Sequence, residues 1–152
     1  MRSHTSDWFE CKVQYKNGEN KKVTELYTVE ALSFTEAEAR ITEEMTAYCI
    51  GGFEVKDIKK SKYKEVWFSS EANADRFYQA KIQFITIDEK TGKEKHSNML
   101  YLVQASTLKD AIKGIDEMMK GTMTDYASVE AKETKIMDVI EYVPNISNKE
   151  AE

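Results

Sequence analysis

The sequence predicts an α+β fold in which a ββαββ (or ββαβ) unit occurs twice, as a tandem duplication. The two copies would form one pseudo-twofold domain with antiparallel sheet and one helix in each repeat. Three observations support this prediction: similar blocks recur in the same order, each block begins with apolar alternation, and each half then changes to helical spacing. Repeat 1 spans residues 8–69 and repeat 2 spans residues 76–143 of the 152-residue chain, a length that fits a single globular domain over 8–143.

The first block of each half pairs two aromatic residues with an alternating pattern. Residues 8–15 (WFECKVQY) match residues 77–84 (FYQAKIQF). A period of two is typical of a half-buried β-strand. Asn17-Gly18 then indicates a two-residue hairpin turn in the first half, and residues 88–92 indicate a longer turn in the second.

A returning strand and a helix follow in each half. Residues 26–31 (LYTVEA) match residues 100–105 (LYLVQA). Ser33 and Thr107 each precede an acidic residue by three positions, which is the spacing of a helix N-cap with a carboxylate in the first turn. The apolar stripe behind these caps consists of Ala37, Ile41 and Met45, then Ala111, Ile115 and Met118 or Met119.

Glycines end both helices, and further strands complete each half. The expected strands lie at about residues 53–60, 63–69, 127–133 and 135–143, and the glycines are Gly51, Gly52 and Gly121. A polar connector over 69–75 joins the repeats. Residues 1–7 are expected to form an N-terminal tail and residues 144–152 a disordered C-terminal tail.

Composition restricts the function classes. Apolar residues make up 41% of the chain and the formal net charge is -5. The overall field therefore repels phosphate backbones, which disfavours nucleic acid as a partner except at a local basic patch. No stretch approaches the roughly 18 apolar residues of a membrane span, and no apolar signal core follows the N-terminus. Two cysteines without CxxC spacing fit a reducing compartment. We therefore expect a cytoplasmic protein without a membrane partner.

Candidates for catalysis are few. Cys11 matches Ala80 of the second half, so it is expected to pack in the core, as is Cys49. His96 is expected to be a solvated turn residue. Helix carboxylates such as Glu43 and Glu117 are expected on solvated faces, and the alternative is a metal or acid/base pair between them. We predict no catalytic residue, no metal site and no cofactor, so the chain is expected not to be an enzyme.

A basic and aromatic cluster is the best candidate for binding. We expect Lys60, Lys62, Tyr63 and Trp67 to contact a ligand, with the lysines holding phosphate groups and an aromatic ring stacking on a base. The surrounding members are Lys56, Lys59, Lys64 and Phe68. The alternative, which we favour, is that the lysines protect a sheet edge from aggregation while Trp67 packs inside.

Five segments carry a resemblance to a known family. They are residues 8–13 (WFECKV), 31–40 (ALSFTEAEAR), 55–60 (VKDIKK), 120–123 (KGTM) and 136–139 (IMDV). Over about residues 8–143 the chain resembles the domain of unknown function numbered 4494. The resemblance implies a source in Bacteroidetes-type bacteria or their phages, and it implies no activity or catalytic residue.

These observations favour a non-catalytic binding or adaptor protein of unknown ligand, with the ligand held where the two halves meet. The alternative is a protein that sequesters a small anionic ligand such as a nucleotide. A metal-dependent hydrolase that uses Glu43 and Glu117 is a weaker alternative.

Overall fold

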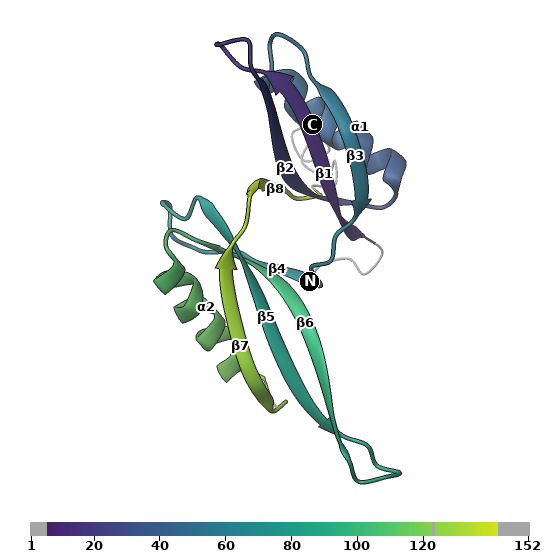
Figure 1. The fold of residues 1–152 in the computed structure, drawn as a ribbon, viewed down its shortest axis with the longest axis vertical. Coiled ribbons are helices and arrows are strands. Elements are labelled where there is room, and N and C mark those ends of the chain that lie inside the picture. The colour runs from purple at the N-terminus through teal and green to yellow at the C-terminus, as the bar shows by residue number, and fades with distance from the viewer. Residues whose placement is uncertain (1–5, 123, 143–152) are drawn as a thin grey trace, which may run out of the picture. The chain divides into compact units, whose positions relative to one another are not determined.

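The computed structural model describes residues 6–122 and 124–142 and has an α+β fold (Figure 1). Within these residues, eight strands form two four-stranded sheets, and two helices accompany them. This arrangement confirms the predicted α+β class. The chain divides into two compact units. The first unit draws its described residues from 1–61 and 139–152, and the second unit spans 62–138. Neither described helix is long and apolar enough to cross a membrane.

The first unit contains a hairpin, a helix and two further strands. Its sheet and helix are β1 (Asp7–Lys16), β2 (Lys22–Ala31), α1 (Phe34–Tyr48), β3 (Glu54–Lys60) and β8 (Ile136–Ile140), and residues 136–138 of β8 fall within the second unit. The sheet order is β3-β1-β2-β8, and β1 pairs antiparallel with both β2 and β3. Figure 1 shows α1 lying along one face of this sheet.

The core of the first unit forms between α1 and the inward residues of its hairpin. Ala37, Ile41 and Met45 are the buried residues of α1, as the helical stripe predicts. Ile41 and Met45 pack with the alternating residues Cys11, Val13, Tyr27 and Val29 of β1 and β2, whereas Ala37 packs with Phe9 and Ala31, and all of these residues are buried. Cys11 is fully buried and packs in this core, which confirms its predicted place.

The second unit is built from five elements, the first of which is a short strand. The elements are β4 (Glu65–Trp67), β5 (Arg76–Ile87), β6 (Glu94–Ala105), α2 (Leu108–Lys120) and β7 (Tyr126–Glu133). The sheet order is β4-β6-β5-β7, with β5 antiparallel to β6 and β7. The expectation of a purely antiparallel sheet is wrong at β4, which pairs parallel to β6. Parallel pairing requires a crossover, and β5 supplies it because it lies between β4 and β6 in the chain.

The helix of the second unit covers its sheet in the same manner. Ala111, Ile115 and Met119 are the buried residues of α2, and they pack on inward residues of β5 and β6. Both predicted caps are present, because the side chain of Ser33 accepts from the Glu36 N–H and that of Thr107 accepts from the Asp110 N–H.

The first hairpin differs from its prediction in the length of its turn. The loop between β1 and β2 covers residues 17–21, and its left-handed residue is Asn20 (φ 61°), not Gly18. The Asn17 side-chain oxygen accepts from the backbone N–H groups of Glu19 and Lys21, at 2.9 and 3.0 Å. This local bonding competes with a tight two-residue turn and stabilises the wider loop.

The fourth strand of each sheet follows the other hairpin in the chain. β4 comes after β3 but pairs with β6, whereas β8 comes after β7 but belongs to the sheet of β2. The boundaries of the compact units therefore differ from those of the predicted repeats, and the single-domain arrangement stays a prediction. β1 begins at Asp7, and residues 1–5 and 143–152, which hold most of the two predicted tails, lie outside the described residues.

Candidate functional site

A pocket of about 270 Å³ opens within the second unit. Its walls are the end of β4, the connector that follows, the end of β6 and one flank of α2. The side chains that matter below are those of Trp67, Phe68, Glu71, Asp110, Lys113 and Glu117, together with the backbone at Gly114. The volume is close to the lower end of typical small-ligand pockets, which run from about 300 Å³ upward.

Aromatic rings form one wall of this pocket. The indole of Trp67 stacks on Tyr101, with ring centroids 4.4 Å apart and an interplanar angle of 18°. Its Nε1–H is buried and has no hydrogen-bond partner among the described residues. Phe68 is 40% exposed beside it. An unpaired buried donor costs about 1–3 kcal/mol, so this wall is held by ring packing and not by polar contacts of the indole.

Carboxylates dominate the polar part of the lining. Asp110, Glu117 and Glu71 contribute three negative charges, against the single ammonium of Lys113. The Oδ2 of Asp110 accepts a hydrogen bond from the Ser106 Oγ at 2.8 Å. The pocket therefore has an excess of negative charge.

Gly114 provides space on the helix flank of the pocket. A Cβ placed on Gly114 would meet only Val103 Cγ1, at 3.9 Å, which is ordinary van der Waals contact. Glycine within a helix costs about 1 kcal/mol relative to alanine. Because packing of the Cβ does not require glycine here, its effect is to leave the adjacent volume open.

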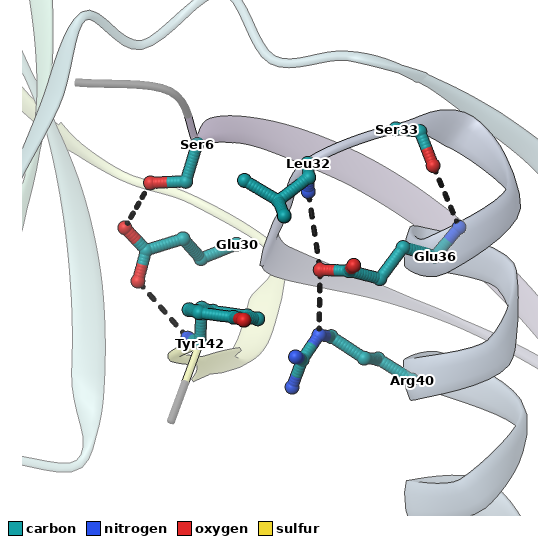
Figure 2. Close-up of polar contacts among 7 residues, drawn as sticks. All are labelled: Ser6, Glu30, Leu32, Ser33, Glu36, Arg40 and Tyr142. Atoms are coloured by element: carbon teal, nitrogen blue, oxygen red, sulfur yellow. Dashed lines mark hydrogen bonds and ion pairs between the residues drawn. The ribbon is translucent and has the colours of Figure 1, made fainter. Parts of the chain in front are cut away.

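The corresponding place in the first unit is filled by two large side chains (Figure 2). Arg40 occupies the same position relative to the N-cap of α1 as Gly114 does in α2. Its guanidinium carbon lies 4.3 Å from the ring centre of Tyr142, and its Nε lies 3.3 Å from Glu36 Oε1. The Glu36 Oε1 also accepts from the Leu32 N–H. Cation, carboxylate and ring thus form one closed cluster.

The backbone around these two places is arranged alike. The Tyr142 N–H donates to Glu30 Oε1 at 2.9 Å, and the Ser69 N–H donates to Gln104 Oε1 at 3.0 Å. Tyr142 and Ser69 are each the second residue after the fourth strand of their sheet, and Glu30 and Gln104 are each the penultimate residue of their hairpin. We call this matched arrangement of strand ends and helix flank the shared frame. It carries Arg40 and Tyr142 in the first unit and Gly114 and Ser69 in the second. The space beside the helix is therefore filled by side chains in the first unit and open in the second.

The four predicted ligand-binding residues have different surroundings. Trp67 lines the pocket, whereas Tyr63 is buried and its hydroxyl donates to Gln79 Oε1 at 3.1 Å. The Lys62 ammonium lies 5.6 Å from the Tyr63 ring centre. Lys60 belongs to the first unit, where its Nζ lies 3.6 Å from Asp7 Oδ2.

Two other lysines of the cluster, Lys56 and Lys59, also meet carboxylates. Lys59 pairs with Glu10 at 3.3 Å and Lys56 with Glu54 at 3.4 Å. Lys56, Lys59 and Lys60 lie on β3, which is an edge strand of the first sheet. Charged residues on an edge strand discourage pairing with other chains, so these contacts favour the edge-protecting interpretation over phosphate binding.

Two further chemical candidates, Cys11 and His96, belong to different units. Burial raises the pKa of the Cys11 thiol to about 12, which makes its reactive thiolate rare. His96 lies in β6 and not in a turn, with ring nitrogens 3.1 Å from Gln83 Oε1 and 3.4 Å from Glu94 Oε2. Among residues 6–122 and 124–142, no group of three or more His, Cys, Asp or Glu side chains is placed to hold a metal ion.

Sequence reasoning did not identify Asp110, Gly114 or Gln104 as site residues. The signal that points to them is a break in the internal similarity, because glycine stands in α2 where α1 has Arg40. The smaller side chain at Gly114 predicts a pocket only if the strand beside this part of α2 is known. That strand is β4, and its pairing with β6 is set by the tertiary fold.

A second polar cluster lies in the first unit, near the first hairpin. The carboxylate of Glu25 is 9% exposed and accepts from the Tyr27 hydroxyl at 2.7 Å and from the Tyr15 hydroxyl at 3.1 Å. Burial, the hydrogen bond to Glu25 and its negative charge together raise the pKa of Tyr15 to about 12 and also raise that of Tyr27.

Because of this cluster, the free energy of unfolding is expected to vary with pH in the alkaline range. The raised pKa means that the folded state binds the Tyr15 proton more tightly than the unfolded state does. The stabilisation that protonated Tyr15 contributes is therefore complete below about pH 10 and is lost as the pH rises toward about 12. Tyr15→Phe is therefore expected to flatten the fall in unfolding free energy over this range, measured by urea unfolding. Tyr126→Phe, at an exposed ring, serves as the control, and an unchanged slope for Tyr15→Phe would contradict the prediction.

No curated protein matches the chain. The family model described as a domain of unknown function, DUF4494, matches residues 7–142, which is most of the chain and includes both hairpins, both helices and the pocket. The chain therefore belongs to the DUF4494 family.

Proposed function

We propose that this chain is a non-catalytic binding protein that takes its ligand into the pocket between β4 and α2. The observation that carries the proposal is the contrast between the two units. The frame that holds Arg40 and Tyr142 in the first unit holds Gly114 and Ser69 in the second, which leaves about 270 Å³ open. A concave site with an aromatic wall and a few directed polar groups is typical of ligand recognition.

The charge of the lining bears on the anionic-ligand alternative. Three carboxylates against one ammonium repel a phosphate, and the lysines of β3 are occupied by neighbouring acids. These contacts favour a neutral or cationic ligand over a nucleotide.

We also propose that the two halves arose by duplication of a ββαββ unit whose fourth strands were exchanged. Matched N-caps, matched buried helix residues and the matched bonds to Glu30 and Gln104 support this origin. Free Cys11 and Cys49 support the further proposal of a cytoplasmic location.

The binding proposal is tested by following backbone amide signals of the full chain by NMR. Small cationic, neutral and anionic molecules are added in turn, and we expect the signals of Ser69, Gln104 and Gly114 to move with at least one class. Gly114→Arg should fill the pocket and abolish the response. Gly114→Ala is the matched control and should preserve it, because its Cβ fits at 3.9 Å from Val103.

Two results would contradict binding in this pocket. One is an absence of shifts at these three residues with every class of molecule. The other is a response that persists unchanged in Gly114→Arg, since the ligand would then lie elsewhere.

A further inference from the structure

We infer that the pocket of the second unit binds a guanidinium cation supplied from outside the chain. This inference rests on the proposed binding function and names its ligand chemistry. The first unit shows which group the shared frame accommodates, namely the planar cation of Arg40 between a carboxylate and an aromatic ring. The second unit has no arginine at that position, because Gly114 stands there.

The partners of the missing cation are present in the second unit. Asp110 occupies the same position relative to the N-cap as Glu36, the carboxylate that pairs with Arg40. Its Oδ2 accepts from Ser106, and no hydrogen bond to its Oδ1 is found among the described residues. Phe68 and Trp67 provide aromatic surface, as the Tyr142 ring does in the first unit. A carboxylate and an aromatic wall therefore line the pocket, and the position that Arg40 holds in the first unit carries no cationic side chain in the second.

Additional carboxylates favour an external cation over an internal one. Glu117 and Glu71 line the same pocket, and with Asp110 they outnumber Lys113. Lys113 is the residue before Gly114, so its side chain starts from a different face of α2, and it is exposed. The lining thus keeps unbalanced negative charge next to open space, which a bound cation would neutralise.

The shape of the site favours guanidinium over ammonium. A guanidinium is planar, presents several N–H donors in a fork that matches a carboxylate, and stacks on aromatic faces. An ammonium is compact and strongly hydrated, and it forms no such stack. Arg40 on Tyr142 shows the planar arrangement within this same fold.

The test compares three small probes on the full chain by NMR. Methylguanidinium is the planar cation, methylurea is its neutral planar counterpart, and methylammonium is a cation without the plane. We expect methylguanidinium to shift the amide signals of Ser69, Gln104 and Gly114 at concentrations where methylurea does not. Methylammonium should bind more weakly than methylguanidinium.

Two carboxylate variants separate local contact from overall charge. Asp110→Asn should weaken methylguanidinium binding about tenfold or more, because a charge-assisted hydrogen bond is lost. Asp116→Asn removes the same charge from a residue of α2 that does not line the pocket, so it should leave the affinity nearly unchanged. A third variant, Arg40→Ala, empties the place in the first unit, where added methylguanidinium should shift the Tyr142 signal.

The outcomes separate this inference from the proposed function. If methylurea binds as well as methylguanidinium, or if Asp116→Asn weakens binding as much as Asp110→Asn, the guanidinium inference is wrong while a binding pocket remains. If Arg40→Ala gains a methylguanidinium site and the Gly114 pocket shows none, the inference is also wrong. A pocket that no molecule of any class enters contradicts both proposals.

Two sources of guanidinium are distinguished by a second pair of probes. Agmatine represents a small metabolite, and a Gly-Arg-Gly peptide represents an arginine side chain on a partner protein. Tighter binding of the peptide indicates a protein partner, and tighter binding of agmatine indicates a small molecule. Either result supports recognition of guanidinium.

Discussion

Trp67→Ala is expected to lower the free energy of unfolding by about 3 kcal/mol, the order found when a large aromatic side chain is truncated in a packed site. The indole is partly buried against the core of the second unit and stacks on Tyr101 at 4.4 Å. Its removal therefore costs burial, the ring pair and the aromatic wall of the pocket. Urea unfolding followed by circular dichroism measures the loss, and methylguanidinium binding should weaken in parallel.

Trp67→Phe is the matched control for this prediction. It keeps an aromatic ring against Tyr101 and removes the buried Nε1–H that has no partner in the described part of the chain. Because relief of an unpaired donor, about 1–3 kcal/mol, offsets the loss of ring area, we expect a net change within about 1 kcal/mol. If Trp67→Phe were as destabilising as Trp67→Ala, the indole N–H would have to make a contact that the structure does not show.

Glu30→Ala is expected to lower the free energy of unfolding by about 2–3 kcal/mol. The carboxylate is 5% exposed and accepts from the Tyr142 N–H and from the Ser6 hydroxyl, each at 2.9 Å (Figure 2). Alanine would leave both donors without this acceptor, and it would loosen the segment after β8 that carries Tyr142. The loss is measured by urea unfolding at neutral pH.

The second unit supplies the control for Glu30. Gln104 stands at the corresponding position of β6 and accepts from Ser69 through its side-chain oxygen. Glu30→Gln is therefore expected to retain the acceptor and to cost about 1 kcal/mol or less. Equal destabilisation by alanine and glutamine would show that the negative charge of Glu30, and not its acceptor role, maintains the contact.

Local features of the fold were predictable from the sequence because short-range chemistry sets them. Ser33 and Thr107 cap their helices as predicted, since a hydroxyl three residues before an N–H needs only local geometry. Alternation placed Cys11 and Ala80 on inward strand faces, and both are fully buried. The turn at Asn17 was not predicted, because its side chain forms backbone bonds that compete with the tight turn.

The candidate site was only partly predictable. The basic and aromatic cluster pointed to Trp67, which lines the pocket, but it grouped Trp67 with lysines that pair with acids on β1 and β3. Asp110 belonged to a predicted helix cap, which gave no sign of a binding role, and Gly114 belonged to no motif. The prediction that a ligand lies where the two halves meet stays a prediction.

The sequence by itself determined the hairpins, the helices, their caps and the faces they bury, because these depend on the periodicity and chemistry of neighbouring residues. The tertiary structure alone decided which sheet receives each fourth strand. β4 joins β6 and β8 joins the sheet of β2, and these pairings connect segments that no local pattern links. They also bring Ser69 beside Gln104 and Tyr142 beside Glu30, so that an absent side chain at Gly114 becomes a pocket and Arg40 becomes its filled counterpart.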